Sequence, residues 1–274
     1  MKYTPYYLII ILLFCLTNCT VKENDRSKDN MKGKIESFVE FKSYVLIDSG
    51  KLDLEKKVEF MATKVGYNTD GNYEYYAFFD ILEDSIQLGA KTLFKYENNK
   101  VIQRDYNGEE QLINTNIFTK DNKGNIIHML SERPDDHTKD SESFVYYSNN
   151  RLDSTVTITN GNKRTERREY LDKYGSFKNI VTDQSGLKSE SFYYKDEKGR
   201  TCKTTVDNQT TVYEYNEHND LITHKSDESL ITYQYKYDKT GNWIERIMHK
   251  EIKNDTIFNK WAELSEREFK YLED

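Results

Sequence analysis

The chain has 274 residues, and its 40 basic and 47 acidic side chains, which give a net charge of −7, are interspersed. No basic stripe is present that could release counterions from a nucleic acid, so that class of partner is disfavoured. With cysteines only at Cys15, Cys19 and Cys202, we expect the fold to be held by its core without an internal disulfide.

The first 18 residues are predicted to be a signal peptide. Lys2 supplies a positive charge, and Leu8 to Leu16 is an unbroken apolar run. This run is shorter than the roughly 20 residues needed to span a bilayer. Its length is typical of the apolar core of a signal peptide.

Cys19 is the predicted lipidation site. The sequence Leu16-Thr17-Asn18-Cys19 resembles a bacterial lipobox, in which the cysteine is acylated and becomes the first residue of the mature protein, although Asn18 departs from the small residue usual there. The alternative is an ordinary secretory signal with an incidental cysteine. Thr20 after the cysteine favours the outer membrane, on either its periplasmic face or the cell surface. Residues 19–34 are polar and charged and are interpreted as a flexible tether.

From residue 35 to 274 the chain alternates turns with strand-like segments, which predicts one repeat domain. A first set of turns is rich in Asp, Asn and Gly, as in Asp121-Asn-Lys-Gly-Asn125 and Asp238-Lys-Thr-Gly241, and a looser second set lies between them. Gly and Asn suit such positions because the backbone must adopt positive φ. Turns at both ends of every strand are the pattern of an antiparallel meander.

The strands carry aromatic residues with a period of two. Ile231, Tyr233, Tyr235 and Tyr237 share one face of their strand, and the 22 tyrosines of the chain favour strands. Residues 52–65 fit a helix or a strand, and the neighbouring hairpins favour a strand. We therefore predict an all-β fold, an antiparallel β-meander of hairpin repeats that forms a long curled or spiralling sheet. Whether the sheet closes is left open.

The segment Tyr235-x-Tyr-Asp-x-x-Gly-Asn-Trp243 resembles the YD-type repeat of Rhs-like proteins. The match is close for this unit and degenerates upstream to about Tyr67. Taken with the lipobox, the chain resembles the YD-repeat lipoproteins of the Bacteroidetes. This resemblance implies a curling β-sheet without implying an activity, and it makes 263–271 a final edge strand.

No residues converge on a recognisable chemistry. The five histidines are scattered without metal-ligand spacing, and neither a metal nor another cofactor is expected. Pro134-Asp-Asp-His137 is interpreted as a solvated loop, and Cys202 as a packed thiol. Trp243 and Trp261 are candidates for stacking on a sugar ring, although packing near the end of the sheet is the simpler interpretation.

The favoured hypothesis is a non-enzymatic, lipid-anchored envelope protein whose β-surface binds a glycan or another envelope protein. One alternative is an envelope-associated carbohydrate hydrolase, which would need carboxylates that converge in a cleft. A second alternative is an immunity or antitoxin-type partner of an Rhs-like toxin.

Overall fold

The computed structural model describes residues 24–48, 51–82, 85–134, 139–253 and 258–272. Within them the chain folds into one antiparallel sheet of 18 strands, preceded by the short helix α2 (Asp25–Lys28). The strands of the first half are β1 (Ile35–Asp48), β2 (Lys51–Tyr67), β3 (Tyr73–Leu82), β4 (Ser85–Glu97), β5 (Lys100–Asn107), β6 (Leu112–Lys120), β7 (Ile126–Glu132), β8 (Lys139–Ser148) and β9 (Arg151–Thr159). Those of the second half are β10 (Asn162–Tyr170), β11 (Phe177–Thr182), β12 (Lys188–Lys195), β13 (Thr201–Val206), β14 (Gln209–Tyr215), β15 (Leu221–Lys225), β16 (Ser229–Tyr237), β17 (Trp243–Lys253) and β18 (Phe258–Tyr271).

The sheet closes into a barrel, which corrects the prediction of a curled or spiralling sheet. Each strand pairs with its neighbours in the chain, and β1 also pairs with β18, from Ile35 opposite Tyr271 to Val45 opposite Ala262. Segment 263–271 is therefore not an edge strand. Closure gives every strand two partners, and it removes the free edges that an open sheet exposes. The all-β class, the antiparallel meander of hairpins and the strand at 52–65 are as predicted.

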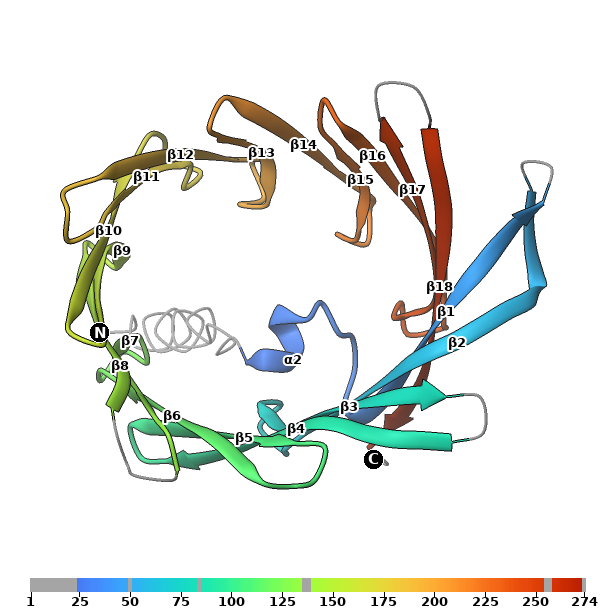
Figure 1. The fold of residues 1–274 in the computed structure, drawn as a ribbon, viewed down its shortest axis with the longest axis horizontal. Helices are drawn as coiled ribbons and strands as arrows, with labels where there is room; N and C mark the ends of the chain where they lie inside the picture. The colour runs from blue at the N-terminus through green and yellow to red at the C-terminus, as the bar shows by residue number, and fades with distance from the viewer. Residues whose placement is uncertain (1–23, 49–50, 83–84, 135–138, 254–257, 273–274) are drawn as a thin grey trace, which may run out of the picture.

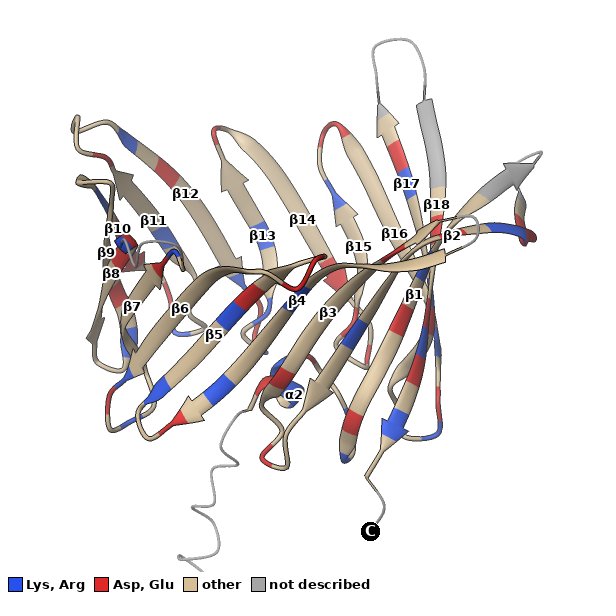
Figure 2. Cartoon of the chain, turned by 60° about the horizontal axis from the view of Figure 1, so that its bottom comes forward, with Lys and Arg blue, Asp and Glu red and all other residues tan. Residues whose placement is uncertain are grey.

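Figure 1 shows the strands as a ring around a wide interior, with α2 inside the ring. We call the end that carries α2, Ile35 and Leu272 the helix rim, because the β2–β3 turn and every second connection after it lie there. The other end, with the β1–β2 turn, is the far rim. Figure 2 shows α2 at the lower end of the wall.

A five-residue loop recurs around the helix rim. Its first residue is Asp or Asn, whose side chain accepts hydrogen bonds from the backbone N–H groups two and four residues later, as in Asp121 with Lys123 and Asn125. Its fourth residue has positive φ, for example +87° at Gly124. Six of these loops lie on the helix rim and two on the far rim; they begin at Asn68, Asp121, Asp172, Asp196, Asn216 and Asp238, and at Asn107 and Asp183.

The β1–β2 hairpin leaves the ring at the far rim. The β1–β2 register shifts between Lys42 and Ser43 and again between Val45 and Leu46, and pairing of β1 with β18 stops at Val45. Beyond these bulges the hairpin projects away from the wall, as Figure 1 shows.

Two small hydrophobic clusters lie on opposite faces of the wall near β1. One joins Met31, Ile35, Phe38, Val65 and Tyr67, and it attaches the segment after α2 to the lumenal face. The other joins Val45, Ile247, Ala262 and Leu264, with Leu52 packed against it. The described core is concentrated at the closing seam between the first and last strands.

Candidate functional site in the barrel lumen

The segment from Asn24 to Lys34, which includes most of the predicted tether, packs inside the helix rim. The Asn24 side chain caps α2 by accepting from the Ser27 backbone N–H at 3.0 Å. The same side chain donates to the Asp70 carbonyl at 2.8 Å, and the Arg26 backbone N–H donates to the Gly71 carbonyl at 2.9 Å. The β2–β3 loop therefore holds the start of the segment.

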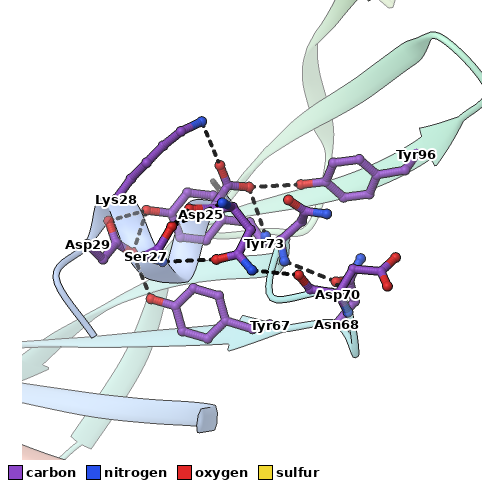
Figure 3. A network of polar contacts seen from close by, with 11 residues as sticks. Asp25, Ser27, Lys28, Asp29, Tyr67, Asn68, Asp70, Tyr73 and Tyr96 are labelled. Atoms are coloured by element: carbon purple, nitrogen blue, oxygen red, sulfur yellow. Dashed lines mark hydrogen bonds and ion pairs between the residues drawn. The ribbon is translucent and has the colours of Figure 1, made fainter. Parts of the chain in front are cut away.

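Two carboxylates of this segment accept hydrogen bonds from the lumenal tyrosines that Figure 3 shows. The Tyr67 and Tyr73 hydroxyls donate to Asp29 at 2.6 and 2.7 Å, and the Tyr96 hydroxyl donates to Asp25 at 3.1 Å. Burial, followed by the bond to Asp29, raises the pKa of Tyr67 and Tyr73 above their ordinary value. Both hydroxyls therefore stay protonated as donors well into the alkaline range.

The end of the segment is held from the opposite side. The Asn242 side chain makes two bonds with the Lys32 backbone, accepting from its N–H at 2.6 Å and donating to its carbonyl at 2.9 Å. The Asn30 side chain donates to the His218 carbonyl at 2.8 Å. These contacts join α2 to the β14–β15 and β16–β17 loops, so the segment bridges strands that are far apart in the chain.

A pair of partly buried arginines lies next to the segment. Arg267 of β18 contacts Glu40 of β1 at 2.8 Å, and its guanidinium lies 3.4 Å from the centre of the Trp243 ring and 4.7 Å from that of Phe38. Arg246 contacts the same Glu40 at 3.6 Å. Burial lowers the pKa of Arg267, and Glu40 opposes that shift. The cluster thus balances buried charges across the closing seam.

A cavity of about 220 Å³ adjoins this cluster. Its lining combines four aromatic, five polar or charged and two aliphatic residues: Asp29, Met31, Phe38, Glu40, Lys42, Thr63, Val65, Tyr73, Tyr76, Phe78 and Arg267. Phe78 is 37 % exposed, and the Tyr76 ring meets it edge-on at 4.7 Å. The cavity therefore offers an open aromatic surface beside a carboxylate, an ammonium and a hydroxyl group. This combination can hold a small polar molecule that also has an apolar face.

The lumenal wall continues from this cavity as a network of amides and hydroxyls. Cross-strand partners share a face of the sheet. Val65 faces the lumen, and successive pairing across β3 to β6 therefore places Tyr76, Thr92, Asp105 and Asn114 on the lumenal face as well. Asp105 accepts from Thr92 at 2.8 Å, from Gln103 at 2.9 Å and from Asn116 at 3.1 Å. We call these four residues, with Asn114 and Ser131, the Asp105 network.

A second cavity, of about 440 Å³, lies near the far rim between β9, β10 and the β11–β12 loop. Its lining is polar throughout: Thr157, Thr159, Asn162, Lys163, Arg164, Glu166, Asp183 and Gln184. Without an aromatic surface it lacks the apolar half of a typical small-molecule site. The smaller cavity near α2 is therefore the better candidate site.

The outer face of the wall carries charged residues along its strands. Cross-strand partners on the outer face of β3 to β7 form a row that runs from Tyr75 through Leu93 and Arg104 to Thr115 and Glu132. On other strands, Lys236 pairs with Glu245 at 2.8 Å and Lys178 with Glu190 at 2.7 Å. Figure 2 shows acidic and basic residues along the strands as well as at their ends.

The residues singled out in the sequence do not come together. Cys19 lies outside the described residues. Trp243 is buried in the wall beneath Arg267 and Arg246, and Trp261 lies in β18 opposite Lys250; their role in sugar stacking stays a prediction. Cys202 is half-buried, with its thiol 3.5 Å from the Tyr194 carbonyl.

The residues that line the cavity are not marked as a site by the sequence. Asp29 was part of an apparently unstructured polar segment, and no local pattern marks it as a partner of two tyrosines. Arg267 carried a weak signal, because it shares a strand face with Phe269 and Tyr271. An arginine that shares a strand face with aromatic residues indicates an ion-pair partner elsewhere in the fold.

Two absences hold for the described part of the chain. No group of three or more His, Cys, Asp or Glu side chains there is arranged to hold a metal ion. None of its helices is long and apolar enough to cross a membrane.

No protein-family model matches the chain, and no curated protein matches it. Among solved structures, the barrel is similar to a porin-like protein from Bacteroides uniformis, with a TM-score of 0.52 and 11% sequence identity. The match covers 87% of this chain and 98% of that protein. At this level of identity the similarity shows a shared barrel fold.

These findings overturn the resemblance to YD/Rhs-like repeat lipoproteins. The barrel has a porin-like structural neighbour, and the Tyr-Asp-x-x-Gly segment is one copy of the five-residue loop. Asp238 starts that loop and Gly241 supplies its positive φ, so the motif follows from the geometry of the turn. The immunity role depended on the Rhs-like resemblance and loses its support with it.

Proposed function

We propose that this protein is a non-catalytic envelope protein, tethered to the outer membrane through an acylated Cys19, that binds a saccharide in its barrel lumen. The observation that carries the proposal is the contrast between the two faces of the wall. The lumenal face combines an open aromatic ring with amides, hydroxyls and paired charges. The outer face carries ionic side chains along its strands, with Arg104 and Arg167 near the middle of β5 and β10.

The outer face argues against a barrel that itself crosses a bilayer. A lipid-facing Lys or Arg costs about 2–4 kcal/mol at the bilayer midplane, and Arg167 of β10 and Arg104 of β5 both face outward near the middle of their strands. The porin-like neighbour favours a channel that opens through the membrane, and this charge pattern disfavours it. Attachment through a lipid on Cys19 needs no apolar outer band.

The lumen suits a neutral polyol better than an ion. Near the candidate cavity, Glu40 is neutralised by Arg267 and Arg246, so the site has no large excess of one charge. Phe78 can pack against the C–H face of a sugar ring, while Lys42 and Thr63 lie within the same lining to bond its hydroxyls. A cavity of about 220 Å³ is below the usual range for drug-sized ligands, about 300–1,000 Å³, and suits one ring.

The same geometry disfavours a hydrolase. Retaining and inverting glycosidases need one free carboxylate and one protonated carboxylic acid on either side of the bond. Of the two carboxylates in the lining, Glu40 is bound by arginine and Asp29 by two tyrosine hydroxyls. Neither is left free for proton transfer.

A glycan array with the purified full-length protein tests the binding role. We expect retention of a defined class of saccharides, and a loss of at least tenfold in affinity for Phe78→Ala. Phe192→Ala is the matched control, because Phe192 pairs with Lys178 on the outer face and should not matter. Equal affinity of both variants, or no binding by the native protein, would refute a saccharide site at this cavity.

Cell fractionation tests the attachment. Cys19→Ala should release the protein from the membrane fraction, whereas Cys202→Ser should leave it there. Retention of Cys19→Ala in the membrane, together with ion conductance of the native protein in planar bilayers, would favour a spanning channel.

A further inference from the structure

We propose that the helix rim is the face of the barrel that lies against the lipid surface, with the far rim directed away from it. This inference rests on the proposed lipidation of Cys19. It adds an orientation and an interaction surface, with the lipid headgroups as the partner.

The reach of the chain places the anchor near the helix rim. Cys19 precedes Asn24 by five residues, and an extended chain covers about 3.3–3.6 Å per residue, so the anchor lies within about 18 Å of Asn24. Asn24 itself is fixed at the β2–β3 loop by the bonds to Asp70 and Gly71 described above. The far rim is separated from Asn24, and so from the anchor, by the length of the strands.

Because residues 24–34 are bound to the barrel, they add no length to the free chain between Cys19 and the helix rim. Asp25 and Asp29 are bound by tyrosines, and Lys32 by the Asn242 side chain, so residues 24–34 do not serve as free tether. A longer free tether would let the barrel take any orientation. A short tether restricts the barrel to orientations in which the helix rim lies against the membrane.

The helix-rim loops carry no excess of acidic charge at their surface, unlike the loops of the far rim. On the helix rim, Asp121, Asp172, Asp196 and Asp238 accept hydrogen bonds from their own loops. Beside them, the helix-rim loops expose four lysines, Lys123, Lys173, Lys198 and Lys239, and four acidic residues, Asp70, Asp172, Glu197 and Glu217, so their exposed charges balance. Basic side chains at a surface are attracted to anionic headgroups. Tyr174, 37 % exposed in one of these loops, is of the type that settles at headgroup depth.

The far rim differs in its loop charges. Its exposed loop residues include the acidic Glu109, Glu110, Asp207, Asp227 and Glu228. The far rim also exposes apolar side chains, such as Leu187 and Ile86, but acidic loops accompany them around the rim. Anionic headgroups repel such a surface. With the helix rim against the membrane, a saccharide from the aqueous side enters the lumen through the far rim.

Fluorescence quenching in vesicles tests the orientation. The full-length acylated protein, with Cys202→Ser as background, is labelled at Asn122→Cys or at Gln184→Cys. These positions are equivalent in the same five-residue loop, the first on the helix rim and the second on the far rim. The vesicles contain phosphatidylethanolamine, phosphatidylglycerol and a quencher carried on a lipid headgroup.

We expect the label at Asn122→Cys to be quenched at least threefold more strongly than the label at Gln184→Cys. Vesicle flotation and mass spectrometry of the acyl group, measured on the same samples, separate the outcomes. Floating acylated protein with equal or reversed quenching overturns the orientation and leaves the anchor intact. Protein that carries no acyl group and does not float overturns the anchor and the orientation together.

Discussion

The two rims of this barrel are the opposite ends of the same strands, but they differ in their loops and in the contacts that those loops make. At the helix rim, six copies of one hydrogen-bonded loop, a capped helix and a buried ion-pair cluster satisfy most polar groups. Among the described residues of the far rim two such loops occur, the β1–β2 hairpin leaves the ring, and Leu187 is 71 % exposed. The comparison indicates that the helix rim holds the barrel closed and that the far rim is free to accept what enters it.

The difference also explains how a barrel with a wide interior can remain closed. A large lumen offers little apolar burial, because facing walls do not touch. Closure then depends on the seam between β1 and β18 and on the segment that bridges the helix rim. Changes at the seam should therefore cost more free energy of unfolding than equivalent changes on the wall.

The largest effect is expected at the seam. Arg267→Ala leaves Glu40 buried without its closest partner, and breaking a buried pair in this way costs about 3–5 kcal/mol. The free energy of unfolding, from urea denaturation of the full-length protein, measures it. Lys178→Ala breaks a partly exposed ion pair on the outer wall and should cost less than about 1 kcal/mol. Equal costs for the two variants would contradict a special role for the seam.

A smaller effect is expected where the bridging segment docks. Asp29→Ala removes the acceptor of two tyrosine hydroxyls, which should cost about 1–3 kcal/mol of the free energy that holds residues 24–34 in place. Hydrogen exchange of these residues measures that opening. Asp70→Ala is the control, since the α2 segment binds only the backbone of Asp70. Unchanged exchange in Asp29→Ala would show that the segment is held by other contacts.

Alkaline pH should weaken the same docking without a mutation. Burial raises the pKa of Tyr67 and Tyr73, so their contribution to stability is complete below the unfolded pKa of about 10 and is lost as pH rises through the folded value. Tyrosinate absorbance should therefore show a late-titrating fraction that ionises together with release of residues 24–34. Ionisation of every tyrosine near pH 10 with the segment still docked would contradict this linkage.

The smallest effect on stability is expected in the five-residue loop, and it tests whether this loop is equally rigid on the two rims. Gly199 and Gly186 occupy its fourth position at φ +79° and +82°, and a Cβ at either would meet nothing within 4 Å. Alanine there adds only backbone strain, about 1–2 kcal/mol. Gly199→Ala and Gly186→Ala should shift the urea midpoint equally. A cost confined to Gly199→Ala would indicate that the far-rim loop can relax.

Much of the fold was predictable because local patterns encode it. Alternation such as Tyr233, Tyr235 and Tyr237 identified strands, and the Asp-x-x-Gly segments identified turns, because both depend on neighbours in the chain. Closure was not predictable in this way. It depends on register between β1 and β18, at opposite ends of the chain, and no local pattern reports it.

The candidate site was not predictable for a related reason. Glu40, Phe78 and Arg267 come from three strands, and only the closed register brings them to one cavity. Strand alternation separates the two faces of the wall, but it does not tell which of them turns towards the lumen. The family resemblance was wrong because the Asp-x-x-Gly motif identifies a turn that unrelated β-proteins can share.

The central claim is that water, and not lipid, surrounds the barrel wall. Gln234, exposed on β16 between the lumenal residues Tyr233 and Tyr235, reports this directly. An environment-sensitive label at Gln234→Cys, in full-length Cys202→Ser protein bound to vesicles, should emit as in water and be quenched by aqueous iodide. Emission typical of hydrocarbon, with protection from iodide, would contradict the account and make the barrel a membrane-spanning channel.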